Sequence, residues 1–578
     1  MKRILLILLT LSSFPILLSA QDTQEDPATL LPDINPQDIE IRGEFRARFP
    51  GITRQPILGF SPSPRVFRID PNRLPFLETP DQVIGSVELS QLESYMGPPR
   101  ELQDFPNQSR FFGYAGFGMF TSPETDLFAD IPLTSRSKVT GNLNFISSDG
   151  YIEEDPDSPF RRFNTHISYR NRLNLNNSLV FNLRAKNHFT EFPMPDYFAD
   201  QSEAYRNGFE LFGAEVGFVR KTSSFDNFEV YANFNQTSTT RNPLMAAENN
   251  FPRAFTTTRT VENRITLGGF NQWTGRQIGH VYSVQASYDG GWYNSLNTDF
   301  VGQGLPLNID LNWYIANAEA TWQNQTFSDG RWTLGLKLFT GYDADEEQTF
   351  MVAPLVMYEK GGSSPLRFKA KISGDMTNPG FEGAFLATPI TSFATPLINQ
   401  RRYYGEANVD FDLADFFTVH GGLHISHTSR PIMHTGILWS NPDELFLVRP
   451  SAGLTFNISP RWLTIYGNAE FNIANLDDEF VDDYYGLEKY RITAGLRTAP
   501  FEGAVLRGWI DYIGPRENFR DDSKLGQALL LNIMAEYRVG GNFGVYVKGI
   551  NMLNEDYMLW DDYREMPFAV FGGITFRL

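Results

Sequence analysis

Residues 542–551 read Asn-Phe-Gly-Val-Tyr-Val-Lys-Gly-Ile-Asn, and residues 568–578 read Phe-Ala-Val-Phe-Gly-Gly-Ile-Thr-Phe-Arg-Leu. Both stretches alternate apolar and polar residues, and a polar, acidic loop joins them. A final strand with an open edge in water would invite aggregation. If that edge instead pairs with the first strand, the sheet closes and no edge remains. This pair of strands therefore predicts an all-β chain that forms a transmembrane β-barrel.

The same alternation runs through the chain from about residue 109. Apolar Leu179, Phe181 and Leu183 alternate with Asn182 and Arg184, and equivalent runs begin near residues 228, 366, 417 and 463. Period two is the pattern of a strand with one apolar and one polar face. Many runs reach about ten residues, the length that crosses a bilayer at a tilt. Aromatic residues make up 14% of the chain, which suits strands that face lipid on one side.

The connections between these runs alternate between short and long. Short turns are expected near residues 175–177, 223–226, 275–279, 361–364, 414–416, 459–461, 502–503 and 540–542. Longer loops are expected between them, among them 148–161, 189–207, 377–399, 428–445 and 555–564. Short periplasmic turns and long outside loops are typical of outer-membrane barrels. Counting back from Leu578 predicts about 22 antiparallel strands, the first near Arg110–Phe120.

The N-terminal residues predict export. Two basic residues, Lys2 and Arg3, precede a short apolar run that ends at Ala20, which is the pattern of a signal peptide over residues 1–20. The chain has no cysteine, so disulfides and a cysteine-linked lipid anchor are excluded. A net charge of −19 argues against a nucleic-acid partner. The predicted location is the bacterial cell outer membrane.

Residues 21–108 have a composition of their own, because 13 of these 88 residues are proline. They predict extended chain with a few short strands, placed either in the periplasm or in the barrel lumen. This segment contains four arginines, Arg42, Arg46, Arg48 and Arg54. They could bind polar or acidic residues of the lumen, or they could belong to a solvated periplasmic arm, and the sequence favours neither.

A sequence motif lies in the closing strand pair. Gly549-Ile-Asn-Met-Leu-Asn554, followed by Tyr557, resembles the closing motif of TonB-dependent receptors, in the style of Bacteroidota-type members. The resemblance implies a 22-stranded barrel with an N-terminal plug and a Ton box. This sequence departs from it, because residues 21–37 contain no run like a Ton box and the region before the barrel is shorter than a family plug.

The final strand also resembles the signal that the barrel assembly machinery reads during insertion. Its face carries Phe568, Val570, Ile574, Phe576 and Leu578. Outer-membrane lipid and lipopolysaccharide are the expected surroundings, with an outer-membrane or periplasmic protein as a further expected partner.

A barrel of this strand number has a lumen too wide for its own side chains to fill. Either residues 21–108 fill part of it, or another subunit covers it. The predicted lumen-facing residues are Arg184, Lys186, Lys369, Lys371 and Glu470. The leading hypothesis is transport or uptake across the outer membrane. The alternatives are a non-transporting subunit of a larger outer-membrane complex and a passive porin.

Other patterns predict little chemistry. No nucleophile elbow, zinc-protease or phosphate-loop motif is present, so no catalytic or cofactor-binding residue is assigned. His420 and His424 share a strand face but lie about 13 Å apart, too far for one metal ion. Acidic groups near residues 153–155, 343–347, 477–483 and 561–562 are expected to be solvated outside loops. The aromatic stretch 189–198 is expected in another such loop, near the membrane interface.

Overall fold

The computed structural model describes residues 110–151, 159–192, 205–223, 226–241, 258–275, 279–294, 312–325, 330–343, 348–361, 364–387, 398–414, 416–435, 438–440, 442–459, 462–477, 485–517, 524–560 and 563–578. The predicted signal peptide and the whole proline-rich segment 21–108 lie outside these residues. So do residues 153–155, 344–347, 478–483 and 561–562 of the acidic groups and residues 193–198 of the aromatic stretch. Within the described residues, no helix is long and apolar enough to span a bilayer.

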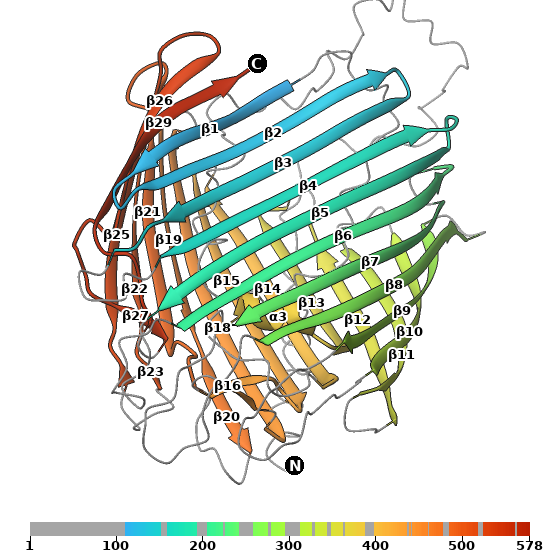
Figure 1. Cartoon of the computed structure of the whole chain (residues 1–578). Helices are drawn as coiled ribbons and strands as arrows, with labels where there is room; N and C mark the ends of the chain where they lie inside the picture. Colours follow the sequence, from blue (N-terminus) through green and yellow to red (C-terminus); the bar gives the residue numbers. More distant parts are fainter. Residues whose placement is uncertain are drawn as a thin grey trace, which may run out of the picture. The chain divides into compact units, whose positions relative to one another are not determined.

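One antiparallel sheet forms the wall (Figure 1). Its strands are β1 (Arg110–Gly118), β2 (Ser122–Thr134), β3 (Ser137–Ser148), β4 (Phe160–Arg172), β5 (Asn177–Phe192), β6 (Tyr205–Lys221), β7 (Asn227–Arg241), β8 (Thr258–Thr274), β9 (His280–Asn294), β10 (Asn312–Gln325), β11 (Gly330–Tyr342), β12 (Gln348–Lys360), β13 (Leu366–Thr377), β14 (Gln400–Ala414), β15 (Phe417–Ser429), β18 (Glu444–Ser459), β19 (Leu463–Phe471), β20 (Ile473–Asp477), β21 (Tyr490–Thr498), β22 (Ala504–Ile513), β25 (Ala528–Arg538), β26 (Phe543–Ile550) and β29 (Ala569–Arg577).

The other described elements belong to the long connections. They are helix α3 (Gly380–Ala387) and three short hairpins: β16 (Met433–Thr435) with β17 (Leu438–Ser440), β23 (Arg516–Glu517) with β24 (Lys524–Leu525), and β27 (Met558–Trp560) with β28 (Tyr563–Arg564).

The wall has the predicted strand number. β19 and β20 both pair with β18 and are interrupted only at Asn472, so the 23 segments of the sheet form 22 wall strands. The last strand closes the barrel onto the first, from Phe112 opposite Arg577 to Gly118 opposite Phe571. Two further backbone bonds join Phe111 and Leu578 at 2.8 and 2.6 Å. The predicted fold class is therefore confirmed.

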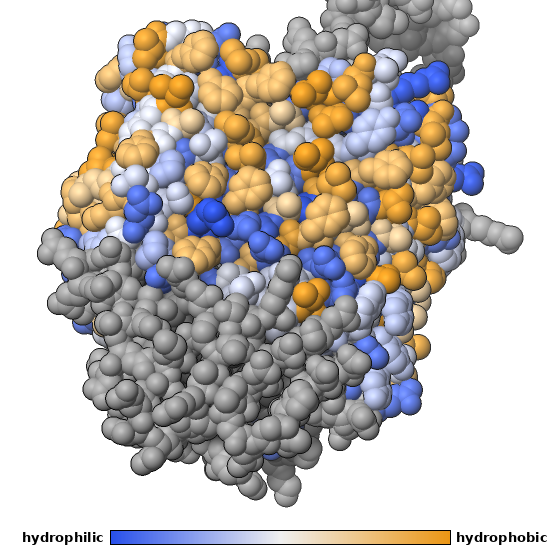
Figure 2. All heavy atoms as spheres, viewed as in Figure 1, coloured by the Kyte–Doolittle hydropathy of each residue, from blue (hydrophilic) through white to orange (hydrophobic). Residues whose placement is uncertain are grey.

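The two faces of the wall differ as the alternation predicts. Large apolar side chains lie exposed along the outer face, for example Leu334, Leu336 and Leu338 of β11 and Ile510 of β22. Figure 2 shows such residues spread across the outer face of the strands seen in Figure 1. Near the short turns, aromatic pairs gather, among them Trp273 with Tyr282 and Trp332 with Tyr358. Exposed apolar side chains with an aromatic girdle are what a lipid-facing wall requires.

The closing motif has a structural role at the outside end of β26. Asn551, at φ +47°, donates from its side chain to the Glu555 carbonyl at 2.8 Å and accepts from the Glu555 amide at 2.9 Å. Its own amide donates to Asn532 of β25 at 3.0 Å, and Tyr557 packs in a small core with Ile513. The motif thus fixes the last long loop against the neighbouring strands.

Two loop predictions for the wall and its rim need correction. Residues 189–192 were expected in an outside loop but lie in β5, because their pairing with β6 continues to Phe192 opposite Tyr205. Asp343 was expected in a solvated acidic loop but is fully buried and accepts hydrogen bonds from the Asn399 amide and from Arg430, both at 3.2 Å.

Candidate functional site at helix α3 in the barrel lumen

The connection between β13 and β14 carries helix α3, which packs against side chains of the inner face. Residues 377–399 were expected to be an outside loop. Instead, Phe381, Ala384 and Phe385 are almost fully buried among inward-facing residues of several wall strands. That apolar cluster comprises, on the wall side, Phe209, Leu211, Tyr293, Trp313, Ile315, Phe339, Met351, Ala353 and Met376. The helix therefore occupies part of the lumen beside β6, β9 and β10.

The first turn of α3 is held by a carboxylate from the wall. The Phe381 amide donates to Oε2 of Glu262 on β8 at 2.7 Å. Glu262 is 2% exposed, and a negative charge at a helix N-terminus is favourable because the amides there have no partner within the helix. The Gly380 amide donates a second hydrogen bond, to Oδ1 of Asn378 at 3.1 Å.

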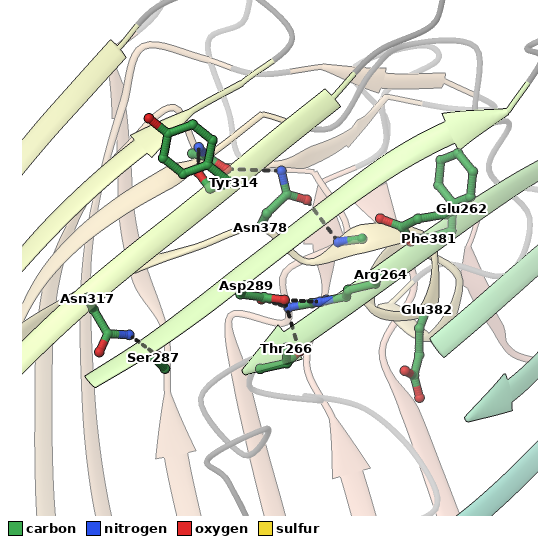
Figure 3. Close-up of polar contacts among 12 residues, drawn as sticks. Glu262, Arg264, Thr266, Ser287, Asp289, Tyr314, Asn317, Asn378, Phe381 and Glu382 are labelled. Carbon is green, nitrogen blue, oxygen red and sulfur yellow. Dashed lines mark hydrogen bonds and ion pairs between the residues drawn. The ribbon is translucent and has the colours of Figure 1, made fainter. Parts of the chain in front are cut away.

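Gly380 is required at this point. Its φ is +61°, and a Cβ at this position would lie 2.8 Å from Oε2 of Glu262 and 3.2 Å from Nη1 of Arg264. Both the backbone conformation and the close approach exclude a larger side chain. Figure 3 shows the Arg264 side chain beside Asp289, with Glu262 near Phe381. Arg264 donates to Asp289 through Nε at 2.8 Å and also through Nη2.

Aromatic contacts hold the apolar face of α3. The Phe385 ring stacks on Phe209 of β6 with ring centroids 4.8 Å apart, and His188 of β5 contacts both rings. Phe381 lies 4.8 Å from the ring of Tyr293 on β9. Each such pair contributes about 0.5–1.5 kcal/mol beyond the apolar area that it buries.

The polar side of α3 pairs with two cations of β5. Glu382 Oε1 lies 2.8 Å from Nζ of Lys186, and Oε2 lies 3.4 Å from Nη2 of Arg184. Arg184 also donates to Asn235 of β7 at 3.0 Å. Burial by itself raises the pKa of Glu382, but Lys186 and Arg184 outweigh burial and hold this pKa below its usual value. Glu382 is therefore an ionised group that joins α3 to strand β5.

The structure places the predicted lumen residues in separate groups. Arg184 and Lys186 meet at Glu382, whereas Lys369 pairs with Glu359 at 3.4 Å. Lys371 lies with Nζ 5.1 Å from the ring centroid of Tyr404. Glu470 pairs with Arg449 at 3.2 Å. All five lie on the polar face of their strands, opposite the exposed apolar residues.

The predicted closing-strand residues lie at the barrel seam. Val570, Ile574 and Phe576 belong to β29, Phe568 directly precedes it and Leu578 follows it. Ile574 and Leu578 are exposed on the outer side, and the opposite face carries the fully buried Phe571.

Sequence reasoning missed the residues of α3 and their acceptor Glu262. One signal was available, since Ala384-Phe-Leu-Ala387 is an unbroken apolar run inside a segment assigned to water. Such a run is unusual for a solvated loop and indicates a buried partner.

The histidines bind neighbouring carboxylates. His420 lies 2.8 Å from Asp410, and His424 lies 3.5 Å from Glu406. Among the residues that the structure describes, no group of three or more His, Asp or Glu side chains is arranged to hold a metal ion.

No protein-family profile and no curated protein matches this sequence. Solved structures match its fold. The ferric-catecholate import receptor Fiu from K12 E. coli, in its closed form, gives a TM-score of 0.62 at 10% identity, over 82% of each chain. The FrpB iron transporter from Neisseria meningitidis gives 0.64 at 9% identity, also over 82% of each chain. The siderophore receptor PirA from Acinetobacter baumannii gives 0.62 at 8% identity, over 82% of this chain and 81% of that one.

The chain has the barrel fold of TonB-dependent receptors. The resemblance that its closing motif suggested is thus confirmed for the barrel. The wall, with its exposed apolar outer face, places the chain in the bacterial outer membrane.

Proposed function

We propose that this barrel transports a small solute across the outer membrane and that helix α3 gates the passage. One observation carries the proposal: the Glu382 carboxylate of α3 forms ion pairs with both Lys186 and Arg184 of the wall, at 2.8 and 3.4 Å. A solute that passes this point has to displace the helix or its carboxylate. The similar structures are named as an import receptor for ferric catecholates and as an iron transporter, which supports uptake as the direction.

The two cations favour an anionic solute. An anion that binds Lys186 and Arg184 replaces the Glu382 carboxylate without leaving either cation unpaired, so the exchange costs little desolvation. Lys369, Lys371 and Glu470 would line other parts of the passage. Their partners Glu359, Tyr404 and Arg449 keep these side chains ordered on the wall.

Efflux from proteoliposomes that contain the full chain tests this function. The vesicles hold carboxyfluorescein as an anionic probe and a neutral sugar of similar size. Glu382→Gln frees the helix and keeps both cations, so we expect faster efflux and a higher anion-to-sugar ratio. Arg184→Gln with Lys186→Gln also frees the helix but removes the cations, so the ratio should fall while sugar efflux rises.

The matched control is Glu319→Gln, which breaks a different inward-facing ion pair, with Lys337 of β11. It should behave as the unchanged protein does. If no form of the protein passes either probe faster than empty vesicles, transport is refuted. That result would favour a structural subunit of an outer-membrane complex, and purification in mild detergent should then recover partner subunits.

The setting of the barrel in the cell is part of the same proposal. The closing strand would be recognised by the barrel assembly machinery, and the outer face would contact lipid and lipopolysaccharide. The pairing of β29 with β1 supports this, because recognition of the last strand has to precede closure.

A further inference from the structure

The ladder between β12 and β13 is incomplete. β12 pairs with β11 along its whole length, and β13 pairs with β14 from Leu366 to Thr377. Between β12 and β13, however, pairing runs only from Lys360 opposite Phe368 to Val356 opposite Ile372. Among the residues that the structure describes, the outside half of β12 therefore has no strand on that side.

The outside half of β13 lies on the inner face of β12 instead of beside it. A Cβ at Gly374 of β13 would lie 2.7 Å from Cε of Met351 and 2.8 Å from Cβ of Ala353, which are inward-facing residues of β12. A Cβ at Gly341 of β11 would lie 2.9 Å from Sδ of Met376. The outside half of β13 thus overlaps the inner face of β12 and reaches β11.

The sequence of β12 is adapted to this overlap. Residues 350–357 are apolar without interruption, which suits a strand that is covered on both faces. The Tyr403 hydroxyl of β14 donates to the Val352 carbonyl at 3.0 Å from the unpaired side. Pro354, two residues further on, turns its nitrogen to the same side and has no N–H to leave unpaired. A proline and a side-chain donor are the means by which proteins protect an exposed strand edge.

The sequence of β13 also fits a second position. Its apolar residues continue to alternate past the end of the ladder, through Gly374 to Met376, while Asp375 and Thr377 keep the polar phase. Continuing the observed register by four residues would place Met376 opposite Val352. In that position Met376 would face lipid and Asp375 the lumen, as the alternation requires.

We propose that the outside half of β13 is a two-position element coupled to α3. It overlaps β12 while the helix is held in the lumen, and it pairs with β12 in the wall when the helix leaves. Only Asn378 and Pro379 separate Thr377 from the helix, so neither part can move far without the other. The inference deepens the proposed function, since the release of α3 is the trigger for both.

The chain has no cysteine, which makes disulfide cross-linking specific. Gly341→Cys with Met376→Cys reports the overlapped position, in which a Cβ at residue 341 would lie 2.9 Å from Sδ of Met376. Val352→Cys with Met376→Cys reports the wall position, in which the continued register places these two residues opposite each other. In outer-membrane vesicles under mild oxidation, the first pair should cross-link readily and the second poorly. Adding Glu382→Gln should raise the yield of the second pair at least severalfold.

Equal yields for the two pairs in the resting protein would overturn the proposal, as would no change on adding Glu382→Gln. A single variant covers the case in which Gly341→Cys fails to fold. Met376→Cys should react slowly with a membrane-soluble maleimide and faster when Glu382→Gln is added. If Glu382→Gln shifts the cross-linking but leaves probe efflux unchanged, the strand movement stands and the gating role of α3 is refuted. If it changes probe efflux but not the cross-linking, only the strand movement is refuted.

Discussion

Replacing Glu382 by glutamine tests how firmly the lumen helix is held. The carboxylate contacts Lys186 and Arg184, and its side chain is 11% exposed, so it is only partly screened by water. A charge-assisted hydrogen bond of this kind contributes about 1.5–3 kcal/mol. Because about 1.4 kcal/mol corresponds to a tenfold change in an equilibrium, the ratio of displaced to bound helix should rise roughly 10- to 150-fold.

Single-channel recording in planar bilayers measures that ratio directly. The unchanged protein should show brief, rare openings, and Glu382→Gln should show a larger open fraction in the same salt. Glu319→Gln supplies the control, because it breaks a different ion pair, with Lys337 of β11, and the overall charge change is the same. An open fraction that is equal in all three proteins would refute the idea that the ion pair holds the helix.

Two further predictions concern the contacts of α3, and a third concerns the register of the wall. The pKa of Glu382 lies below its usual value, so the stabilisation that its ion pairs give the bound helix is complete above the ordinary glutamate pKa. That stabilisation is lost as pH falls through the lower folded-state pKa. The open fraction should therefore rise only in acid, and Glu382→Gln should abolish that rise. Phe385→Ala removes a ring stacked 4.8 Å from Phe209, which should cost about 3–5 kcal/mol and speed hydrogen exchange at the amides of α3. On the wall, Ile465→Arg should cost roughly 2–4 kcal/mol in a refolding titration, and Asn468→Arg on the opposite face much less; equal costs would contradict the register of β19.

Much of the barrel could be predicted because its determinants are local. Alternation in residues such as Leu179, Phe181 and Leu183 assigns each side chain to lipid or lumen within one strand, without reference to any other. Turn residues and strand lengths then set the count of 22, and the closing strand could be recognised by its own pattern.

The site depended on contacts between distant residues. Lys186 and Glu382 are 196 positions apart, and nothing near either of them indicates the other. Arg184 and Lys186 could be assigned to the polar face, but no local pattern showed that a helix from the β13–β14 connection would bind them. The apolar run at residues 384–387 indicated that this segment packs against a buried partner, but it did not indicate which wall strands form that partner.

The sequence alone determined an outer-membrane barrel of about 22 strands, closed by its last strand, because period-two alternation is a property of each strand by itself. Only the tertiary structure decided what occupies the lumen and where the wall is overlapped. The lumen helix is held where Glu262 and Lys186 contact residues more than a hundred positions along the chain, and the overlap lies where Gly374 of β13 packs over Met351 and Ala353 of β12. Such contacts exist only once the strands are assembled into the barrel.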